Sequence, residues 1–250
     1  MIVGGVILLI VALICFFIAR GQAGQLQAMN AADTYTAQLL TDFHKQVTTT
    51  LGADALAQPC EVEGVIECDA PLTAPLSGMA CVAYTRTITR EYEEDVTTTD
   101  AEGKSQTTTE RRSETLENED RRVNFWVRDA TGRALVNPEA AELDLVETAN
   151  RYETAPSPGF GRTRTLGQRS VEHALALGTK VYVLGCAVDL QGQPAVARGP
   201  RDSKAKFLIS RRSERELAQS AASWSRNLYY AAAGSGVLGL VLVVLGLVRR

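Results

Sequence analysis

Cysteine and histidine are the side chains with which this sequence could hold a metal ion or build a nucleophile. The chain has five cysteines and two histidines, which are Cys15, Cys60, Cys68, Cys81, Cys186, His44 and His173. A structural zinc site needs four ligands, and its cysteines usually come in Cys-x-x-Cys pairs. The nearest pair here, Cys60 and Cys68, is separated by "EVEGVIE". The sequence therefore predicts no metal site.

Other patterns that could support catalysis are also weak. The sequence contains no Gly-x-Ser-x-Gly nucleophile elbow. His173 follows Glu172 but has no paired nucleophile, so we interpret it as a surface histidine. "GFG" at 159–161 lacks the strand and helix that a phosphate loop needs, and acidic pairs such as Glu93 and Glu94 lie in solvated charged runs. We expect no catalytic residue and no cofactor.

Both ends of the chain carry long uncharged segments. Residues 2–19 and 228–248 are each long enough to cross a membrane as a helix. Trp224, Tyr229 and Tyr230 lie at the inner end of the second segment and arginines follow it, as is typical of a membrane span. A cleaved signal peptide is disfavoured for the first segment because it has no basic N-terminal region. The sequence predicts an integral, two-pass membrane protein, in the plasma membrane if the source is prokaryotic.

A two-pass chain has both termini on the same side of the membrane and its middle domain on the other. Arginines flank the spans more densely on the domain side, which favours a cytoplasmic domain. Four domain cysteines, an even set, favour an oxidising compartment instead. These are Cys60, Cys68, Cys81 and Cys186, which could form disulfides or remain buried thiols. The side of the domain stays open.

Small residues in the spans indicate close helix packing. Ala232 with Gly236, and Ser235 with Gly239, form small-xxx-small pairs. Such faces allow either packing within the helix hairpin or assembly of a homo-oligomer. Both interpretations stay open from the sequence.

Composition limits the partners of the protein. The net charge is −3, with 22% charged and 45% hydrophobic residues, so no basic surface for nucleic acid is expected. Arginines between 211 and 226 are interpreted as juxtamembrane. The expected partners are the lipid bilayer and an unidentified protein.

The chain between the spans changes character near residue 60. Residues 22–51 show moderately amphipathic helical spacing, and 60–210 are rich in alternating strand patterns. Two threonine runs around a turn at 100–104 predict a long hairpin that protrudes from the core, with a disordered loop as the alternative. Residues 168–177 are predicted to form a short helix, and 211–227 a juxtamembrane helix. The predicted fold is a compact, mainly antiparallel β domain with flanking helices and two transmembrane helices.

A proline-rich corner precedes the central predicted strand. "PLTAPLSG" places Pro71, Leu72, Pro75, Leu76 and Gly78 in a tight turn before the strand that starts near Cys81. The turn fixes how the strand enters the sheet, and it is also a candidate surface for a partner.

The order of these pieces resembles the GIDE domain, also called the beside-a-membrane domain. The similar stretches are "EVEGVIECDAPLTAPLSGMACVAYTRTITREY", "VNFWVRDATGRALVNPEAAEL", "EHALALGTKVYVLGCAV" and "KFLISRRSERELAQ", which together cover about residues 61–219. The family is known from mitochondrial membrane ubiquitin ligases and from prokaryotic proteins of unassigned role. In the mitochondrial members the domain faces the intermembrane space. The resemblance therefore implies a domain that faces outward here.

One departure affects the expected activity. The ligases of the family carry a RING after the second span, whereas this sequence ends at Arg249 and Arg250 without RING zinc ligands. We therefore expect a non-catalytic module that binds a partner or senses conditions beside the membrane. The alternative is a component of RING-type ubiquitination, or of membrane organisation, whose RING another chain supplies.

Overall fold

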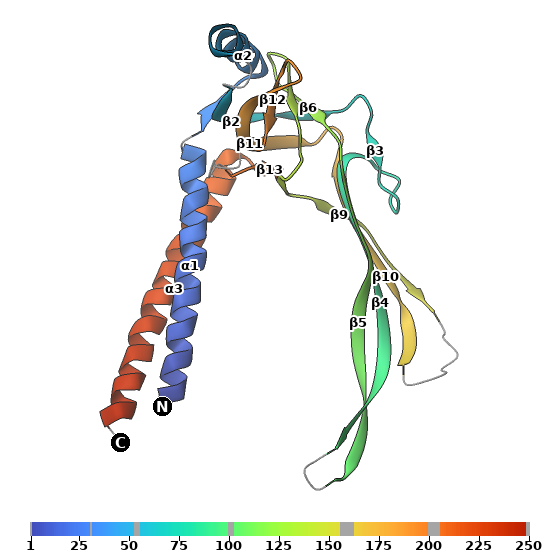
Figure 1. Cartoon of the computed structure of the whole chain (residues 1–250), viewed down its shortest axis with the longest axis vertical. Coiled ribbons are helices and arrows are strands. Elements are labelled where there is room, and N and C mark those ends of the chain that lie inside the picture. Colours follow the sequence, from blue (N-terminus) through green and yellow to red (C-terminus); the bar gives the residue numbers. More distant parts are fainter. Residues whose placement is uncertain are drawn as a thin grey trace.

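The computed structural model describes residues 2–30, 32–52, 56–99, 103–155, 163–199 and 206–248. The chain consists of a long helix hairpin, a β domain at one end of it, and a β-sheet that extends from the domain (Figure 1). The predicted fold class, mainly β with flanking helices and two long apolar helices, is confirmed. The "GFG" turn at 159–161 and the arginines at 249–250 lie outside the described residues.

Two helices, α1 (Ile2–Asn30) and α3 (Glu214–Val248), form the hairpin. Each contains a stretch long and apolar enough to cross a membrane, Val3–Gly21 in α1 and part of Glu214–Leu247 in α3. Their large apolar side chains mostly face outward, including Val3 at 73% exposed and Val237 at 67%. A soluble protein would bury such side chains, so the surface fits a lipid environment.

The helix predicted over residues 22–51 is two separate helices. Residues 22–30 continue α1, the short strand β1 (Asp33–Thr34) follows, and α2 spans Ala37–Leu51. Thr36 caps α2, because its side-chain oxygen accepts a hydrogen bond from the Leu39 backbone N–H at 3.2 Å. The predicted juxtamembrane helix begins at Glu214 and runs without a break into the second span.

A small β-barrel forms the centre of the domain. Its sheet has the order β1-β2-β6-β7-β12-β11-β13-β8, and β2 also pairs with β11. The strands β2, β6, β7, β12 and β11 therefore close into a ring. The bounds are β2 (Ala57–Glu67), β6 (Phe125–Arg128), β7 (Arg133–Val136), β8 (Glu142–Leu143), β11 (Lys180–Leu190), β12 (Gln193–Ala197) and β13 (Leu208–Ser210).

The barrel core is built from β-branched and aromatic residues that suit strands. Val62, Ile66, Phe125 and Val183 are buried in one cluster, which Leu40 of α2 joins from outside the barrel. A side chain at Gly64 would collide with the Arg128 carbonyl, so the glycine lets β2 and β6 approach each other closely. Helix α2 thus packs on the barrel as part of its hydrophobic core.

The second sheet contains β3 (Leu72–Thr73), β4 (Ala80–Thr99), β5 (Ser105–Arg122), β9 (Val146–Thr154) and β10 (Thr163–Ala176). The order is β3-β4-β10-β9, with β5 paired to β4. The predicted hairpin is present, with Thr99 opposite Ser105. The helix predicted over 168–177 is wrong, because this segment lies in β10 and pairs with both β4 and β9.

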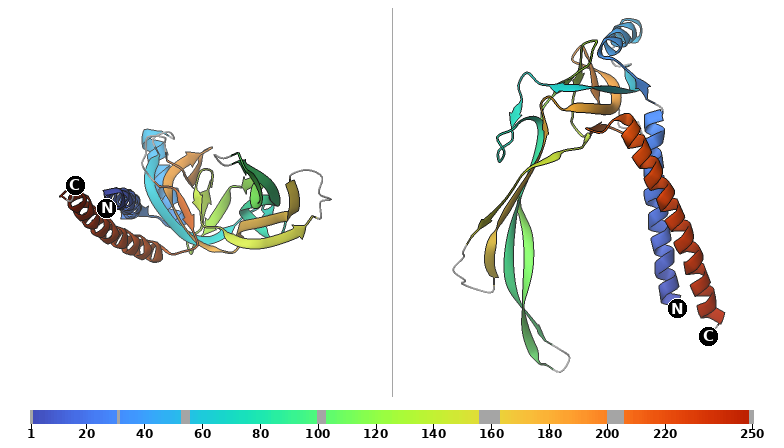
Figure 2. Two further views of the ribbon diagram at one scale, coloured as in Figure 1. Left: turned by 90° about the horizontal axis from the view of Figure 1, so that it is seen from below. Right: turned by 180° about the vertical axis from the view of Figure 1, so that it is seen from behind.

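Most of this second sheet is a single layer, which we call the arm: β4 from Thr85 onward, with β5, β9 and β10. Figures 1 and 2 show that the arm leaves the barrel and runs in the same direction as the helix hairpin, separated from it. Nearly all side chains of β5 are exposed, and those of β4 beyond Tyr84 are only half-buried or exposed. Among the described residues, the part of the arm away from the barrel therefore has no hydrophobic core of its own.

Candidate interaction surface

Cross-strand ion pairs line the arm. Arg86 contacts Glu117 at 2.5 Å and Glu119 at 3.2 Å, which joins β4 to β5. Nearer the tip, Arg112 contacts Glu94 at 2.9 Å. Opposite charges across neighbouring strands each contribute a modest stabilisation, roughly 0.2–1 kcal/mol. The arm is thus held by backbone pairing and a ladder of such pairs in place of a core.

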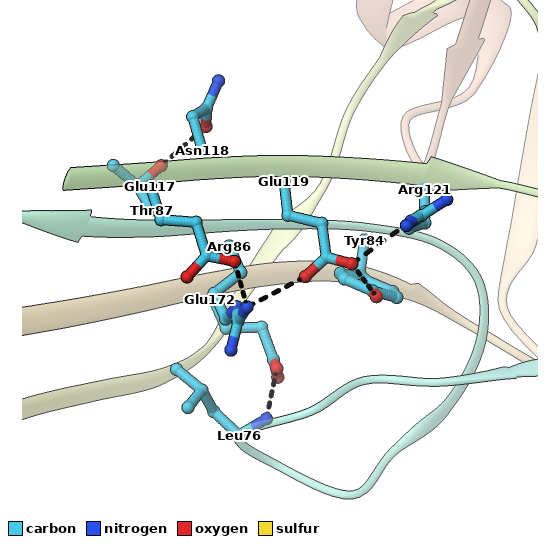
Figure 3. Close-up of polar contacts among 9 residues, drawn as sticks. All are labelled: Leu76, Tyr84, Arg86, Thr87, Glu117, Asn118, Glu119, Arg121 and Glu172. Atoms are coloured by element: carbon cyan, nitrogen blue, oxygen red, sulfur yellow. Dashed lines mark hydrogen bonds and ion pairs between the residues drawn. The ribbon is translucent and has the colours of Figure 1, made fainter. Parts of the chain in front are cut away.

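The ladder continues to where the arm meets the barrel (Figure 3). Tyr84 donates a hydrogen bond to Glu119 at 2.9 Å, and Arg121 donates to the same carboxylate at 3.2 Å. These bonds from Tyr84 and Arg121 lower the pKa of Glu119. Among the described residues, the Nε atoms of Arg86 and Arg90 are buried without a hydrogen-bond partner.

Glu172 is a fully buried carboxylate at the base of the arm. It accepts hydrogen bonds from the Leu76 N–H at 2.6 Å, from the Ser77 N–H at 3.2 Å, and from the hydroxyls of Ser77 at 2.6 Å and Thr148 at 2.7 Å. Burial alone would raise its pKa, but the hydrogen bonds to the ionised form outweigh burial and lower it. Sequence reasoning noticed Glu172 only as the neighbour of His173.

The partners of Glu172 belong to the proline-rich corner. Leu72 of β3 pairs with Cys81 of β4, and the corner closes with the Ala74 N–H donating to the Met79 carbonyl at 2.9 Å. Gly78 has a φ of 71°, a left-handed conformation that favours glycine. Arg151 donates to the Leu76 carbonyl at 2.7 Å. The corner, with Pro71 and Pro75 exposed, is thus fixed to the arm; its predicted role as a partner-facing surface stays a prediction.

The outer edge of the arm is β5, and no other described strand pairs with its second side. Ile88 pairs with Glu117 and Thr89 with Thr115, so Leu116 is an extra residue, a β-bulge. Leu116 is 47% exposed and lies between charged residues of the same strand. Charges and a bulge disfavour the addition of another strand to such an edge, so contacts here would be made by side chains.

The cysteines do not gather into a metal site. Cys60, Cys81 and Cys186 are buried in the β domain, whereas Cys68 is half-buried near the Asn124 carbonyl, and no disulfide links cysteines in the described part of the chain. No described group of three or more Cys, His, Asp or Glu side chains could hold a metal ion. The donor set therefore does not fit a RING-type zinc cluster.

The histidines are also separate. His44 of α2 is buried and contacts Asp189 at the end of β11 at 2.6 Å, so it joins the helix to the barrel. His173 lies half-buried in β10, opposite Thr85 of β4 and Glu147 of β9. Neither histidine lies beside a nucleophile among the contacts described.

A second buried carboxylate lies where the barrel joins the helices. Glu61 accepts hydrogen bonds from Thr34 and Tyr182, both at 2.6 Å. Burial first, and then the Glu61 hydrogen bond, raises the pKa of Tyr182. Glu214 lies at the start of α3, and its pKa is raised mainly by the nearby charge of Glu61. No local sequence pattern predicts this network, because its members are far apart along the chain.

The small residues of α3 face α1. A Cβ at Gly239 would lie 2.9 Å from the Gly5 carbonyl oxygen, and one at Gly236 would lie 3.7 Å from the Cβ of Ala12. Ser235 donates within its own helix, to the Ala231 carbonyl at 2.7 Å. Gly236 and Gly239 therefore contribute to packing within the hairpin, the more modest of the two interpretations, while a role of Ala232 and Ser235 in helix packing stays a prediction.

Comparison with known proteins supplies the family. The family model described as "GIDE: E3 Ubiquitin ligase" matches residues 93–245, from β4 through most of α3. No curated protein and no solved structure matches the chain. The matched range leaves out the proline-rich corner and extends beyond residue 219, where the resemblance seen in the sequence stops. Because the match covers more than half of the chain, the protein belongs to the GIDE family.

Proposed function

We propose that this protein is a non-catalytic, partner-binding module beside the membrane, and that the arm is the surface that binds another protein. The observation that carries this proposal is the single-layer arm, in which the long strands β4 and β5 extend away from the barrel and take no part in closing it. Such a sheet buries little apolar area, so it adds little to the stability of the fold. Its exposed side chains are available for contact with a partner.

The arm offers features that a partner could recognise. Leu116 is an exposed apolar side chain on β5, and Glu114, Glu117 and Asp120 lie near it in the sequence. An exposed apolar residue with carboxylates on either side of it along the strand complements a partner segment that has basic residues around an apolar one, and such a partner would share Glu117 with Arg86 and Glu114 with Arg90. We therefore assign a basic segment of another protein as the partner class.

A photo-crosslinking amino acid at Leu116, in the full chain in native membranes, tests the proposal. The matched control places the same amino acid at Gln46, which is exposed on α2 on the other side of the barrel. The expected result is one discrete adduct with another protein from Leu116, absent from Gln46, and lost when lysines replace Glu114 and Glu117. An adduct only with a second copy of the chain would favour a membrane-organising oligomer, and no adduct would overturn the proposal.

A second candidate function follows from the family description. The matching model is described as an E3 ubiquitin ligase, so the chain could serve as the membrane subunit of a ligase whose RING lies on another chain. Discharge of ubiquitin from a charged conjugating enzyme tests this. The purified chain alone should be inactive, and acceleration by the chain without any added RING protein would contradict the non-catalytic proposal.

We also place the protein as a two-pass membrane protein with both termini on one side and the β domain on the other. The antiparallel hairpin supports this placement, because N and C lie at the same end, away from the barrel (Figure 1). The plasma membrane is the expected location if the source is prokaryotic.

A further inference from the structure

The arm and the helix hairpin point in the same direction. Figure 1 and the right view of Figure 2 show that the end of the arm reaches the level of the free ends of α1 and α3. The hairpin is the part that crosses the membrane, so an arm in this pose would enter the same bilayer. The amino-acid composition of the arm decides whether the arm can be inserted into a bilayer.

The length of the arm exceeds the height of the domain above the membrane. From Thr85 to Thr99, β4 is about 50 Å long, because a strand rises about 3.4 Å per residue. The first span ends at Gly21, so residues 22–30 of α1 raise the domain only roughly 14 Å above the hydrocarbon, at about 1.5 Å per residue. The stretch of α3 before residue 228 gives roughly 21 Å. Most of the arm would therefore lie below the membrane surface.

The arm carries charges on the part that would be immersed. Glu91, Glu93, Glu94 and Asp95 lie on β4, and Arg111 and Arg112 lie opposite on β5. Charged side chains are strongly disfavoured in a bilayer core. Moreover, the second side of β5 has no described partner strand, and open sheet edges do not occur in contact with lipid tails. The arm cannot be inserted.

Few contacts join the β domain to the helix hairpin. Any change in the angle between the domain and the hairpin would have to alter these contacts. Leu217 of α3 packs against Tyr182, Leu184 and Leu208. Ser213 and Glu216 form a capping box, with the Ser213 N–H donating to Glu216 at 3.0 Å and the Glu216 N–H to Ser213 at 3.4 Å. Together with β1, this is a small joint compared with the barrel. A turn of the domain relative to the hairpin would have to occur at this joint.

We infer that, when the hairpin is in the membrane, the domain is turned so that the arm lies along the bilayer surface in contact with lipid headgroups. The smallest turn that frees the arm from the hydrocarbon leaves it against the headgroups. The part of the arm near its tip suits this contact, because Thr97–Thr99 and Ser105–Thr109 are uncharged and rich in hydroxyl groups. Threonine and serine hydroxyls can donate hydrogen bonds, and the oxygens of lipid phosphates and glycerol esters accept them.

This inference goes beyond the proposed function, since it states where the arm lies and not what it binds. An arm along the surface would hold β5 and Leu116 parallel to the membrane plane. Partners that reach the arm would then have to be at the membrane themselves.

Fluorescence quenching by spin-labelled lipids tests the inference in vesicles that contain the full chain. A fluorescent amino acid replaces Thr107 near the tip or Ser113 in the middle of β5, both exposed. The quenching group is placed either on the lipid headgroup or deep in the acyl chain. Control positions are Leu238, 53% exposed in the second span, and Gln46 on α2.

The expected result is loss of fluorescence at Thr107 and Ser113 with the headgroup label and not with the acyl-chain label. Leu238 should respond to the acyl-chain label and Gln46 to neither. Quenching of Thr107 by the acyl-chain label, quenching at Thr107 without Ser113, or no quenching at either position would each overturn the inference. None of these outcomes depends on whether Leu116 forms an adduct, so the inference and the proposed function can fail separately.

Discussion

Glu172 shows what a single buried side chain does in this protein. Its carboxylate accepts the backbone N–H groups of Leu76 and Ser77 and so fixes the proline-rich corner to the arm. A buried charge is tolerated only when it is well paired, and four hydrogen bonds meet that condition here. The residue is therefore a structural anchor for a candidate binding surface.

We expect Glu172→Gln to destabilise the folded domain by about 1–3 kcal/mol, because an amide N–H₂ would replace one acceptor oxygen and face N–H donors. The pKa of Glu172 is lowered in the folded state, so its contribution is present above the pKa of an unfolded glutamate and is lost as pH falls through the folded value. The difference between wild type and variant should therefore shrink in acid. Thermal unfolding at several pH values measures it.

The matched control for this prediction is Glu153→Gln on the exposed edge strand β9. It removes the same charge from the arm without disturbing a buried network. Equal stability of the two variants at neutral pH would show that Glu172 does not anchor the corner.

The cysteines give a second prediction at the residue scale. Burial, followed by the neighbouring Cys186, raises the pKa of the Cys60 thiol, and burial also raises the pKa of Cys81. Both should remain unmodified by a thiol reagent in the folded protein, while the half-buried Cys68 reacts. Mass spectrometry of labelled peptides, with and without prior reduction, checks this; labelling of Cys60 that appears only after reduction would reveal a disulfide.

Sequence reasoning found few of these side-chain roles, for a physical reason. An acidic residue in a strand pattern normally faces solvent, and nothing near Glu172 in the sequence shows that Ser77 and Thr148 will surround it. Gly64 was easier, because a glycine inside a strand pattern already indicates close backbone approach. Roles that depend on distant pairing need the structure.

At the scale of elements, α2 is held to the barrel by a few buried side chains. Leu40 is fully buried in the main core, whereas its neighbour Leu39 is 50% exposed. Leu40→Ala should cost about 2–5 kcal/mol, because it removes buried methyl groups and leaves a cavity. Leu39→Ala is the matched control and should change the free energy of unfolding far less. Chemical denaturation of both variants decides whether α2 belongs to the cooperative core.

The helix hairpin gives a further prediction at this scale. Gly239→Leu should push α3 away from α1, because even a Cβ there would be 2.9 Å from the Gly5 oxygen. Gly234→Leu is the control, since nothing lies within 4 Å of a Cβ at that position. Cysteines at Phe16 and Tyr229, whose rings are 6.1 Å apart, report helix proximity in a Cys15→Ser background. Unchanged cross-linking in Gly239→Leu would contradict the close packing.

The elements differ in how well their patterns predict them. The long hairpin followed from threonine runs around a turn, because strand propensity and turn chemistry agree there. The segment 168–177 contains alanine and leucine, which favour helix, yet pairing with β4 and β9 satisfies its backbone as a strand. The break between α1 and α2 had a usable signal in Thr36, a residue type that favours helix N-caps.

The whole molecule combines an apolar hairpin with a charged arm that must stay out of the hydrocarbon core. These two requirements can be met together only if the domain, including the arm, stays entirely on one side of the membrane. The two candidate spans pack side by side through Gly5 and Gly239, which favours a chain that enters and leaves the bilayer on that same side. The membrane arrangement is thus set by the balance of apolar and charged surface over the entire chain.

We therefore predict that tags fused to the two ends share one side of the membrane and that the β domain lies on the other. Antibodies against each tag, applied to intact and opened cells, report the ends, and an impermeant maleimide on Gln46→Cys reports the domain, because Gln46 is exposed on α2. The ends and Gln46→Cys should show opposite accessibility. Tags on opposite sides would mean that one of the two helices does not span, and a label on the same side as both tags would mean that neither does. Either outcome would also remove the reason for the arm to turn toward the bilayer surface, because the hairpin would no longer cross the bilayer at the level of the arm.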